Sequence, residues 1–138
     1  MQTGQIFIIT GGILHLLMGF FHTRFYSLFG WKNVFVKMER SQQRILYTIH
    51  LALLLLFFIM GLLSIACSGP LSMPTHTSRL VLTGLTLFWM WRAVWQIIYF
   101  RVPGSKRFHH LRKMHYTLTC FFFMLGISYL VPLVIPVS

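Results

Sequence analysis

The sequence predicts an all-α integral membrane protein whose four transmembrane helices pack as an antiparallel bundle. Three observations predict this class: 57% of the 138 residues are hydrophobic, only 9% are charged, and the mean hydropathy is +0.73. An ordinary soluble domain carries about 25% charged residues. Because a backbone in lipid must satisfy its own hydrogen bonds, a chain without strand-like alternation is expected to cross the membrane as helices.

Four stretches of the chain are long enough to cross a hydrocarbon core about 30 Å thick, which takes about 20 apolar residues in a helix. They cover residues 4–23, 45–66, 78–100 and 114–134. The first stretch is not preceded by the basic region of a cleaved signal peptide, so we expect it to remain as a span. Residues 1–138 are therefore expected to form a single four-helix transmembrane domain with short connections.

Two basic connections predict the orientation in the membrane. Ten of the twelve Lys and Arg residues lie between residues 24 and 44 or between residues 101 and 113. By the positive-inside rule these connections face the cytoplasm, and both termini lie on the non-cytoplasmic side. A bacterial inner membrane is the expected location.

The same placement of charge indicates a partner. Basic residues beside membrane spans bind anionic lipid headgroups, so the formal net charge of +11 requires no nucleic-acid partner. The residues expected at the headgroups are Arg24, Lys32, Arg101, Lys106 and Arg107.

Arg92 lies in the middle of the apolar stretch LFWMWRAVWQIIYF and has no acidic residue within the spans to pair with. The only acidic residue of the chain, Glu39, lies in a basic connection. A guanidinium keeps its proton, so an anion, carbonyl oxygens, water or a lipid phosphate must satisfy it. This pattern predicts an anionic ligand. The alternative is that Arg92 extends toward the headgroups, with Trp91 and Trp95 shielding its stem.

Helical spacing predicts which side chains share a face with Arg92. Residues three, four or seven positions apart point the same way, and this set in the third stretch is Phe88, Trp89, Arg92, Gln96 and Tyr99. An aromatic wall beside hydrogen-bond donors suits a flat, oxygen-bearing ligand such as a quinone or the propionate edge of haem. It also suits the end of an ordinary Trp-rich helix at the membrane interface.

The first stretch carries a second polar face, formed by Gly11, His15, Gly19 and His22. Glycines let another backbone or a planar ligand come close. The alternative is close helix packing with the histidines hydrogen-bonded across the interface.

Counting from the basic connections predicts the depth of the polar groups. His22, His50 and His115 lie within about two turns of that end, Gln96 lies about one turn inside, and His15 and Arg92 lie deeper, at similar levels. If these side chains face inward, the cytoplasmic half of the interior is polar and the outer half is apolar.

This asymmetry leads to three functional hypotheses. The first is binding of a small anionic ligand or lipid, or conduction of ions or protons, by an oligomer or a subunit of a complex; its expected site is Arg92, Gln96, His15, His22, His50, Trp89 and Tyr99. The second is a redox subunit binding quinone, haem b or a transition metal, with the histidines 15, 22, 50 and 115 as ligands. The third is a structural or assembly role.

Catalysis of the hydrolytic kind is not expected. A single acidic residue in a connection provides no carboxylate pair, and no serine or cysteine nucleophile stands beside an evident base.

A weak internal repeat is also visible. Residues 50–61 and 115–126 share His, Phe-Phe and Gly at an offset of 65, and Thr10-Gly11 matches Thr83-Gly84 at an offset of 73. Two similar helix hairpins are one explanation, and chance in a sequence rich in Phe and Leu is the other.

Overall fold

The computed structural model describes residues 2–28, 31–100 and 109–135, and this part of the chain is helical, without strands. Its elements are α1 (Thr3–Thr23), α2 (Phe25–Leu28), α3 (Trp31–Phe35), α4 (Arg40–Ala66), α5 (Ser68–Ser72), α6 (His76–Tyr99) and α7 (His109–Val134). The helices α1, α4, α6 and α7 are each long and apolar enough to cross a membrane. The prediction of four membrane-length helices is therefore confirmed.

All four helices begin earlier than the hydropathy predicts, and two of them begin five residues earlier. Helix α4 begins at Arg40 rather than at residue 45, and α7 begins at His109 rather than at residue 114. Arg, Gln, Lys and Leu are good helix formers, so the helix continues past the point where its residues are apolar enough for hydrocarbon. Hydropathy detects only the part of a helix that suits the membrane interior.

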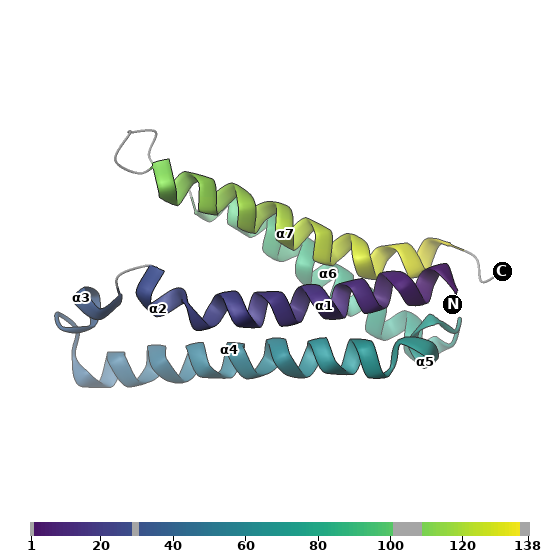
Figure 1. The fold of residues 1–138 in the computed structure, drawn as a ribbon, viewed down its shortest axis with the longest axis horizontal. Coiled ribbons are helices and arrows are strands. Elements are labelled where there is room, and N and C mark those ends of the chain that lie inside the picture. The colour runs from purple at the N-terminus through teal and green to yellow at the C-terminus, as the bar shows by residue number, and fades with distance from the viewer. Residues whose placement is uncertain (1, 29–30, 101–108, 136–138) are drawn as a thin grey trace.

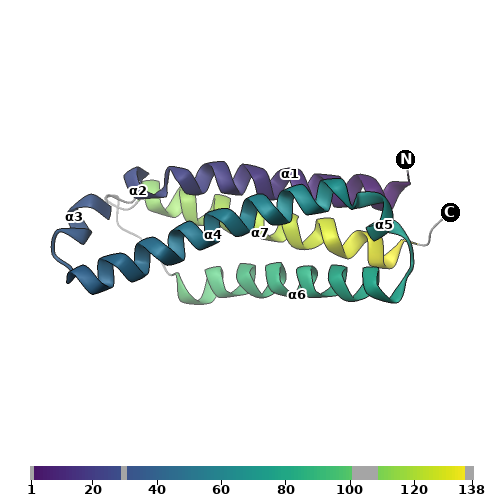
Figure 2. The same ribbon diagram turned by 90° about the horizontal axis from the view of Figure 1, so that it is seen from below.

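The long helices are arranged around α1. Helix α1 packs along α4 on one side and along α7 on the other, and α6 packs along α7 (Figure 1 and Figure 2). Helices α4 and α6 make at most marginal backbone contact with each other. Figure 1 shows α2 and α3 at one end of the molecule, and α5 at the other end, where α1 begins and α7 ends. We call these the basic end and the terminal end.

Glycine permits the close approach of α1 and α4. A Cβ atom at Gly12 would lie 2.9 Å from the carbonyl oxygen of Gly61, and a Cβ at Gly61 would lie 3.0 Å from the carbonyl oxygen of Gly12. The two backbones therefore touch, as at other membrane interfaces built on small residues.

The packing of α6 on α7 shares one part of this arrangement, a glycine covered by a long side chain of the neighbouring helix. A Cβ at Gly61 would also meet the side chain of Leu16 at 2.7 Å, and a Cβ at Gly126 would meet that of Met90 at 2.8 Å. Gly61 and Gly126 are 65 positions apart, the offset expected for the internal repeat. Leu16 and Met90 are 74 apart rather than 73, the same separation as that of the hydrogen-bonded pair His15 and Trp89. The hairpins α1–α4 and α6–α7 therefore correspond, with the first helices shifted by one residue from the expected register.

Candidate functional site

A buried hydrogen-bond network crosses the middle of the molecule around His15. The indole Nε1–H of Trp89 donates to Nε2 of His15 at 3.1 Å. An indole N–H can only donate, so this Nε2 carries a lone pair and a neutral His15 has its proton on Nδ1. That nitrogen lies 2.9 Å from the carbonyl oxygen of Gly11, to which it donates, and 3.1 Å from the hydroxyl of Tyr129.

The network joins all four long helices. The Tyr129 hydroxyl from α7 lies 2.8 Å from Oγ of Ser64 in α4, while His15 comes from α1 and Trp89 from α6. His15 is 1% exposed and Tyr129 is 0% exposed. A Cβ at Gly11 would lie 2.8 Å from Cζ of Tyr129, so only glycine leaves room for this ring. Both ring nitrogens of His15 are engaged, which favours a role in packing over one as a ligand.

Toward the basic end, side chains from all four long helices line a cavity of about 540 Å³. We call it the polar chamber. Its polar lining consists of His22 from α1, His50 from α4, Arg92 and Gln96 from α6, and His115 from α7. Five side chains considered at the sequence level therefore meet around one space, although they lie far apart in the chain.

Three buried polar atoms of the chamber have no hydrogen-bond partner among the described residues: Nη1 of Arg92, Nε2 of His22 and Oε1 of Gln96. The other amide atom of Gln96, Nε2, lies 3.2 Å from Nδ1 of His115. Burying a polar group without a hydrogen-bond partner costs about 1–3 kcal/mol, as judged from mutational data on proteins. Three such atoms in one cavity indicate a place where a ligand or water completes the bonding.

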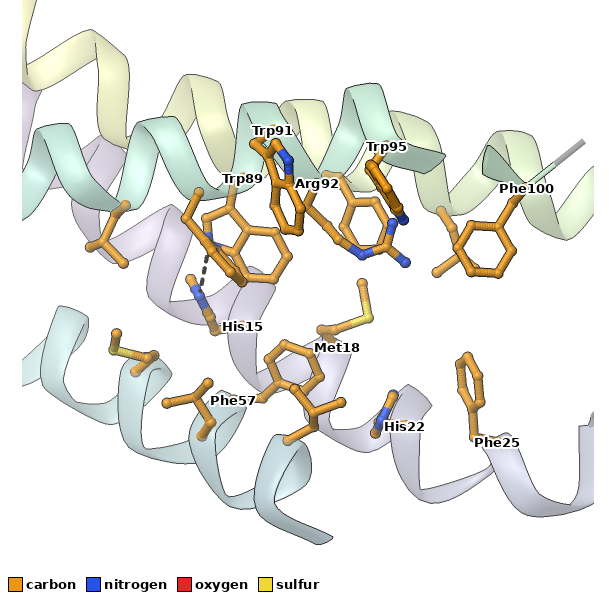
Figure 3. A pocket seen from close by; sticks show the side chains of 17 residues that line it. His15, Met18, His22, Phe25, Phe57, Trp89, Trp91, Arg92, Trp95 and Phe100 are labelled. Carbon is orange, nitrogen blue, oxygen red and sulfur yellow. Dashed lines mark hydrogen bonds between the residues drawn. The ribbon is translucent and has the colours of Figure 1, made fainter. Parts of the chain in front are cut away.

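Aromatic rings surround the guanidinium of Arg92. Its Cζ lies 4.5 Å from the ring centroid of Phe122 and 5.6 Å from that of Phe100. A desolvated cation over such rings gains about 2 kcal/mol, but the ring faces do not satisfy the N–H donors. Figure 3 shows the guanidinium directed away from α6 into the space between the helices.

A second cavity, of about 420 Å³, continues from the chamber toward the terminal end. We call it the apolar groove. It lies between α4, which contributes Leu56 and Met60, and α6, which contributes Leu85 and Phe88. Trp89 and Phe57 also line it (Figure 3). Arg92 lines both the groove and the chamber, so its charge marks their junction.

The described histidines lie in pairs or singly rather than in a group of three. No three His, Cys, Asp or Glu side chains there form a group that would hold a metal. His22 and His50 stack face to face, with ring centroids 4.5 Å apart and planes 21° from parallel. Axial haem ligands instead point a ring nitrogen at the iron from opposite sides.

Tyr99 does not line the chamber or the groove. Its side chain is 67% exposed and stacks on Trp95, with centroids 5.1 Å apart. Trp95 in turn stacks on Trp91 at 5.8 Å. Helical spacing gives only the direction in which a side chain leaves the backbone. At the last residue of α6, the Tyr99 ring packs against Trp95 of the preceding turn instead.

The structure describes only part of the expected headgroup contacts. Arg24 is exposed at the end of α1. Lys32 lies in α3, but its side chain is not described, and Arg101, Lys106 and Arg107 lie outside the described residues.

Sequence reasoning missed the aromatic part of the lining. Phe25 and Trp31 reach the chamber from α2 and α3, while Phe57 and Phe122 both stack on Trp89, at 6.1 and 5.6 Å. Phe57 and Phe122 belong to the internal repeat, so the offset of 65 was the available signal. No spacing rule within one helix could have identified Phe25 and Trp31.

The coupling between Tyr129 and Ser64 can be measured by a double-mutant cycle. We expect Tyr129→Phe and Ser64→Ala each to destabilise the protein, and the double variant to lose less than the sum. Hydrogen bonds between membrane helices average about 0.6 kcal/mol in such cycles, and we expect a coupling of that size. Reversible unfolding in mixed micelles gives the four free energies. Strictly additive losses would contradict a direct bond.

The comparisons with known proteins supply no further guide to this site. No protein-family model, no curated protein and no solved structure matches the chain.

Proposed function

We propose that the protein binds a small anionic group inside the membrane, in the polar chamber, with Arg92 as its counter-charge. The observation that carries this proposal is the buried Nη1 of Arg92, which has no hydrogen-bond partner among the described residues. The only acidic residue, Glu39, is exposed at the start of α4 and does not line the chamber. An anion would satisfy the guanidinium with charge-assisted hydrogen bonds, which are stronger than neutral ones.

The neighbouring side chains can complete the coordination of an anion. His22 donates to it when its free Nε2 carries the proton. The side-chain amide of Gln96 presents Oε1 to the chamber and Nε2 to His115. A half-turn of this amide exchanges the two atoms, so that Nε2 donates to the anion and Oε1 accepts from a protonated Nδ1 of His115.

The proposal includes an orientation and a location. The four helices form an antiparallel bundle, with the chamber in its cytoplasmic half and both termini on the opposite side of a bacterial inner membrane. The Lys and Arg residues other than Arg92 whose side chains are described support this: Arg24, Lys37, Arg40, Arg44, Arg112 and Lys113 lie at the basic end, whereas Arg79 lies at the terminal end. The proposal also includes association with a second copy or a larger complex, since α4 buries only Phe57, Gly61 and Ser64.

Packing beyond the chamber favours binding over conduction. The network around His15 lies between the chamber and the terminal end. At its level the interior is filled by the fully buried side chains of Leu125 and Tyr129, and past it Ile8 is also fully buried. A conduction path would need polar groups or water through this region. A cavity that ends at a packed core suits a ligand that enters and leaves on the same side.

The proposal predicts discrimination by charge. In phosphatidylcholine nanodiscs, we expect the protein to bind dodecyl phosphate at least about tenfold more tightly than 1-dodecanol, because one hydrogen bond to a charged group contributes about 1.5–3 kcal/mol. The four tryptophans of the chain all line the chamber or the groove, so their fluorescence reports on occupancy. Equal affinity for the charged and neutral probes would contradict the proposal.

A further inference from the structure

We infer that the occupant is a lipid-like anion with a long hydrocarbon chain, which enters sideways from the bilayer between α4 and α6. This inference rests on the proposed function and adds the chemical class of the ligand. The anionic head occupies the polar chamber at Arg92, and the chain lies in the apolar groove.

The two cavities have the polarity of an amphiphile. Along α6, Leu85 and Phe88 line the groove, Gln96 lines the chamber, and Arg92 lines both, as does Phe100 just after the helix. Among the described residues, Arg92 is the only Lys, Arg, Asp or Glu that lines the groove, and His15 and His22 also contribute to its lining. A small hydrophilic anion would use the chamber and leave the groove empty or wet, whereas an amphiphile fills both and buries its chain against apolar side chains.

The groove is accessible from the bilayer because the backbones of the helices on its two sides lie apart; among their side chains, the rings of Phe57 and Trp89 stack across the gap. Helices α4 and α6 make at most marginal backbone contact. Leu56 and Phe88, which line the groove, are 42% and 44% exposed, and Trp91 and Trp95 at its edge are 55% and 42% exposed. A chain can therefore enter from the side without passing through either basic connection.

The correspondence between the two hairpins explains why this interface is open. At the contact of α1 with α7, the ring of Tyr129 fills the space over Gly11. The position in α4 that corresponds to Tyr129, at the offset of 65, is Ser64. Serine carries no ring that could fill the corresponding space, so the interface of α4 with α6 lacks the kind of side chain that occupies its counterpart.

A substitution that fills the groove tests whether the hydrocarbon chain of the ligand lies there. Leu56→Trp adds a large ring on the α4 side of the groove, and Leu17→Trp is its matched control. Leu17 is also a partly exposed leucine, but it lines a separate cavity between α1 and α7. We expect Leu56→Trp to weaken dodecyl phosphate binding about tenfold, as overpacking commonly costs 1–3 kcal/mol. Leu17→Trp should bind like the wild type. Equal binding by all three proteins would overturn the inference.

Chain length separates this inference from the proposed function. We expect inorganic phosphate to bind much more weakly than dodecyl phosphate, and binding of both to depend on Arg92. If neither probe requires Arg92, the proposed function fails. If inorganic phosphate binds as tightly as dodecyl phosphate in an Arg92-dependent way, the proposed function stands and only the lipid-like occupant is excluded.

Photo-crosslinking locates the hydrocarbon chain of the ligand directly. Dodecyl phosphate with a diazirine in mid-chain is expected to label peptides of α4 and α6 around Leu56, Met60 and Phe88. Labelling centred on α1 and α7 around Leu17 and Phe121, which line the separate cavity, would overturn the inference. Equal labelling of all four helices would mean that the probe only fills the surrounding bilayer, and would overturn it as well.

Discussion

Arg92→Leu is expected to reduce binding of dodecyl phosphate by about 100-fold or more while the protein remains folded and inserted. Two hydrogen bonds from a guanidinium to an anion, at about 1.5–3 kcal/mol each, account for a loss of this size. The variant also removes a buried donor without a partner, which offsets the loss of the contacts with the Phe122 and Phe100 rings. Titration in phosphatidylcholine nanodiscs measures the affinity, and thermal unfolding checks the fold.

Two further variants show whether the loss of affinity depends on the guanidinium group and on its position in the chamber. Arg92→Lys keeps the charge but lacks the planar fork that bonds an anion through two N–H groups, so we expect it to restore only a small part of the affinity. Arg79→Leu removes a cation from an exposed position at the terminal end and should leave binding unchanged. Wild-type affinity in Arg92→Leu would mean that this arginine serves the membrane surface rather than a ligand.

Gly12→Leu is expected to have the largest effect on stability, a loss of about 3 kcal/mol or more. The Cβ of any residue here would lie 2.9 Å from the Gly61 carbonyl oxygen and 2.7 Å from Cγ1 of Ile65. The first of these atoms belongs to the backbone, so a rotamer change cannot relieve the overlap. Helices α1 and α4 must separate instead, at a greater cost than the 1–3 kcal/mol of ordinary overpacking.

Gly84→Leu is the matched control, because a Cβ at Gly84 meets nothing within 4 Å. It should be neutral or slightly stabilising, since glycine within a helix costs about 1 kcal/mol relative to a good helix former. Unfolding in mixed micelles, together with the yield of monodisperse protein, compares the two variants. Similar behaviour of Gly12→Leu and Gly84→Leu would contradict the close contact of α1 and α4.

The four long helices were predictable because transfer of apolar side chains into hydrocarbon depends on composition and length alone. The direction of Arg92 and Gln96 within α6 was partly predictable, since both follow from the helical repeat. The side chains of other helices that pair with those of α6 were not predictable. Trp89 donates to His15 from 74 residues away, and this pairing depends on how α1 and α6 are rotated about their own axes. Spacing within one helix carries no information on that rotation.

The open interface between α4 and α6 was likewise beyond the sequence pattern. Ser64 gives no hydropathy signal, and its effect depends on what Tyr129 does at the corresponding position of α7. The repeat at the offset of 65 pairs Ser64 with Tyr129. This pairing became meaningful only when the structure showed that Gly61 and Gly126, at the same offset, each contact a long side chain of the neighbouring helix. Tyr99 shows a further limit of the helical repeat. The repeat places it near the direction of Arg92, but its ring is exposed and stacks on Trp95.

The hydrogen bonds that connect His15, Trp89, Tyr129 and Ser64 pin four helices at one level. A shift of one helix at that level would strain a directional hydrogen bond, so we expect the helices to rotate about this level rather than to move there. Helices that pivot there move most at their ends, so spreading of α4 and α6 near Arg92 would part the stacked rings of Phe57 and Trp89 and leave the core beyond in place. The exchange of a bound molecule would then need only a small scissor-like motion of two helices.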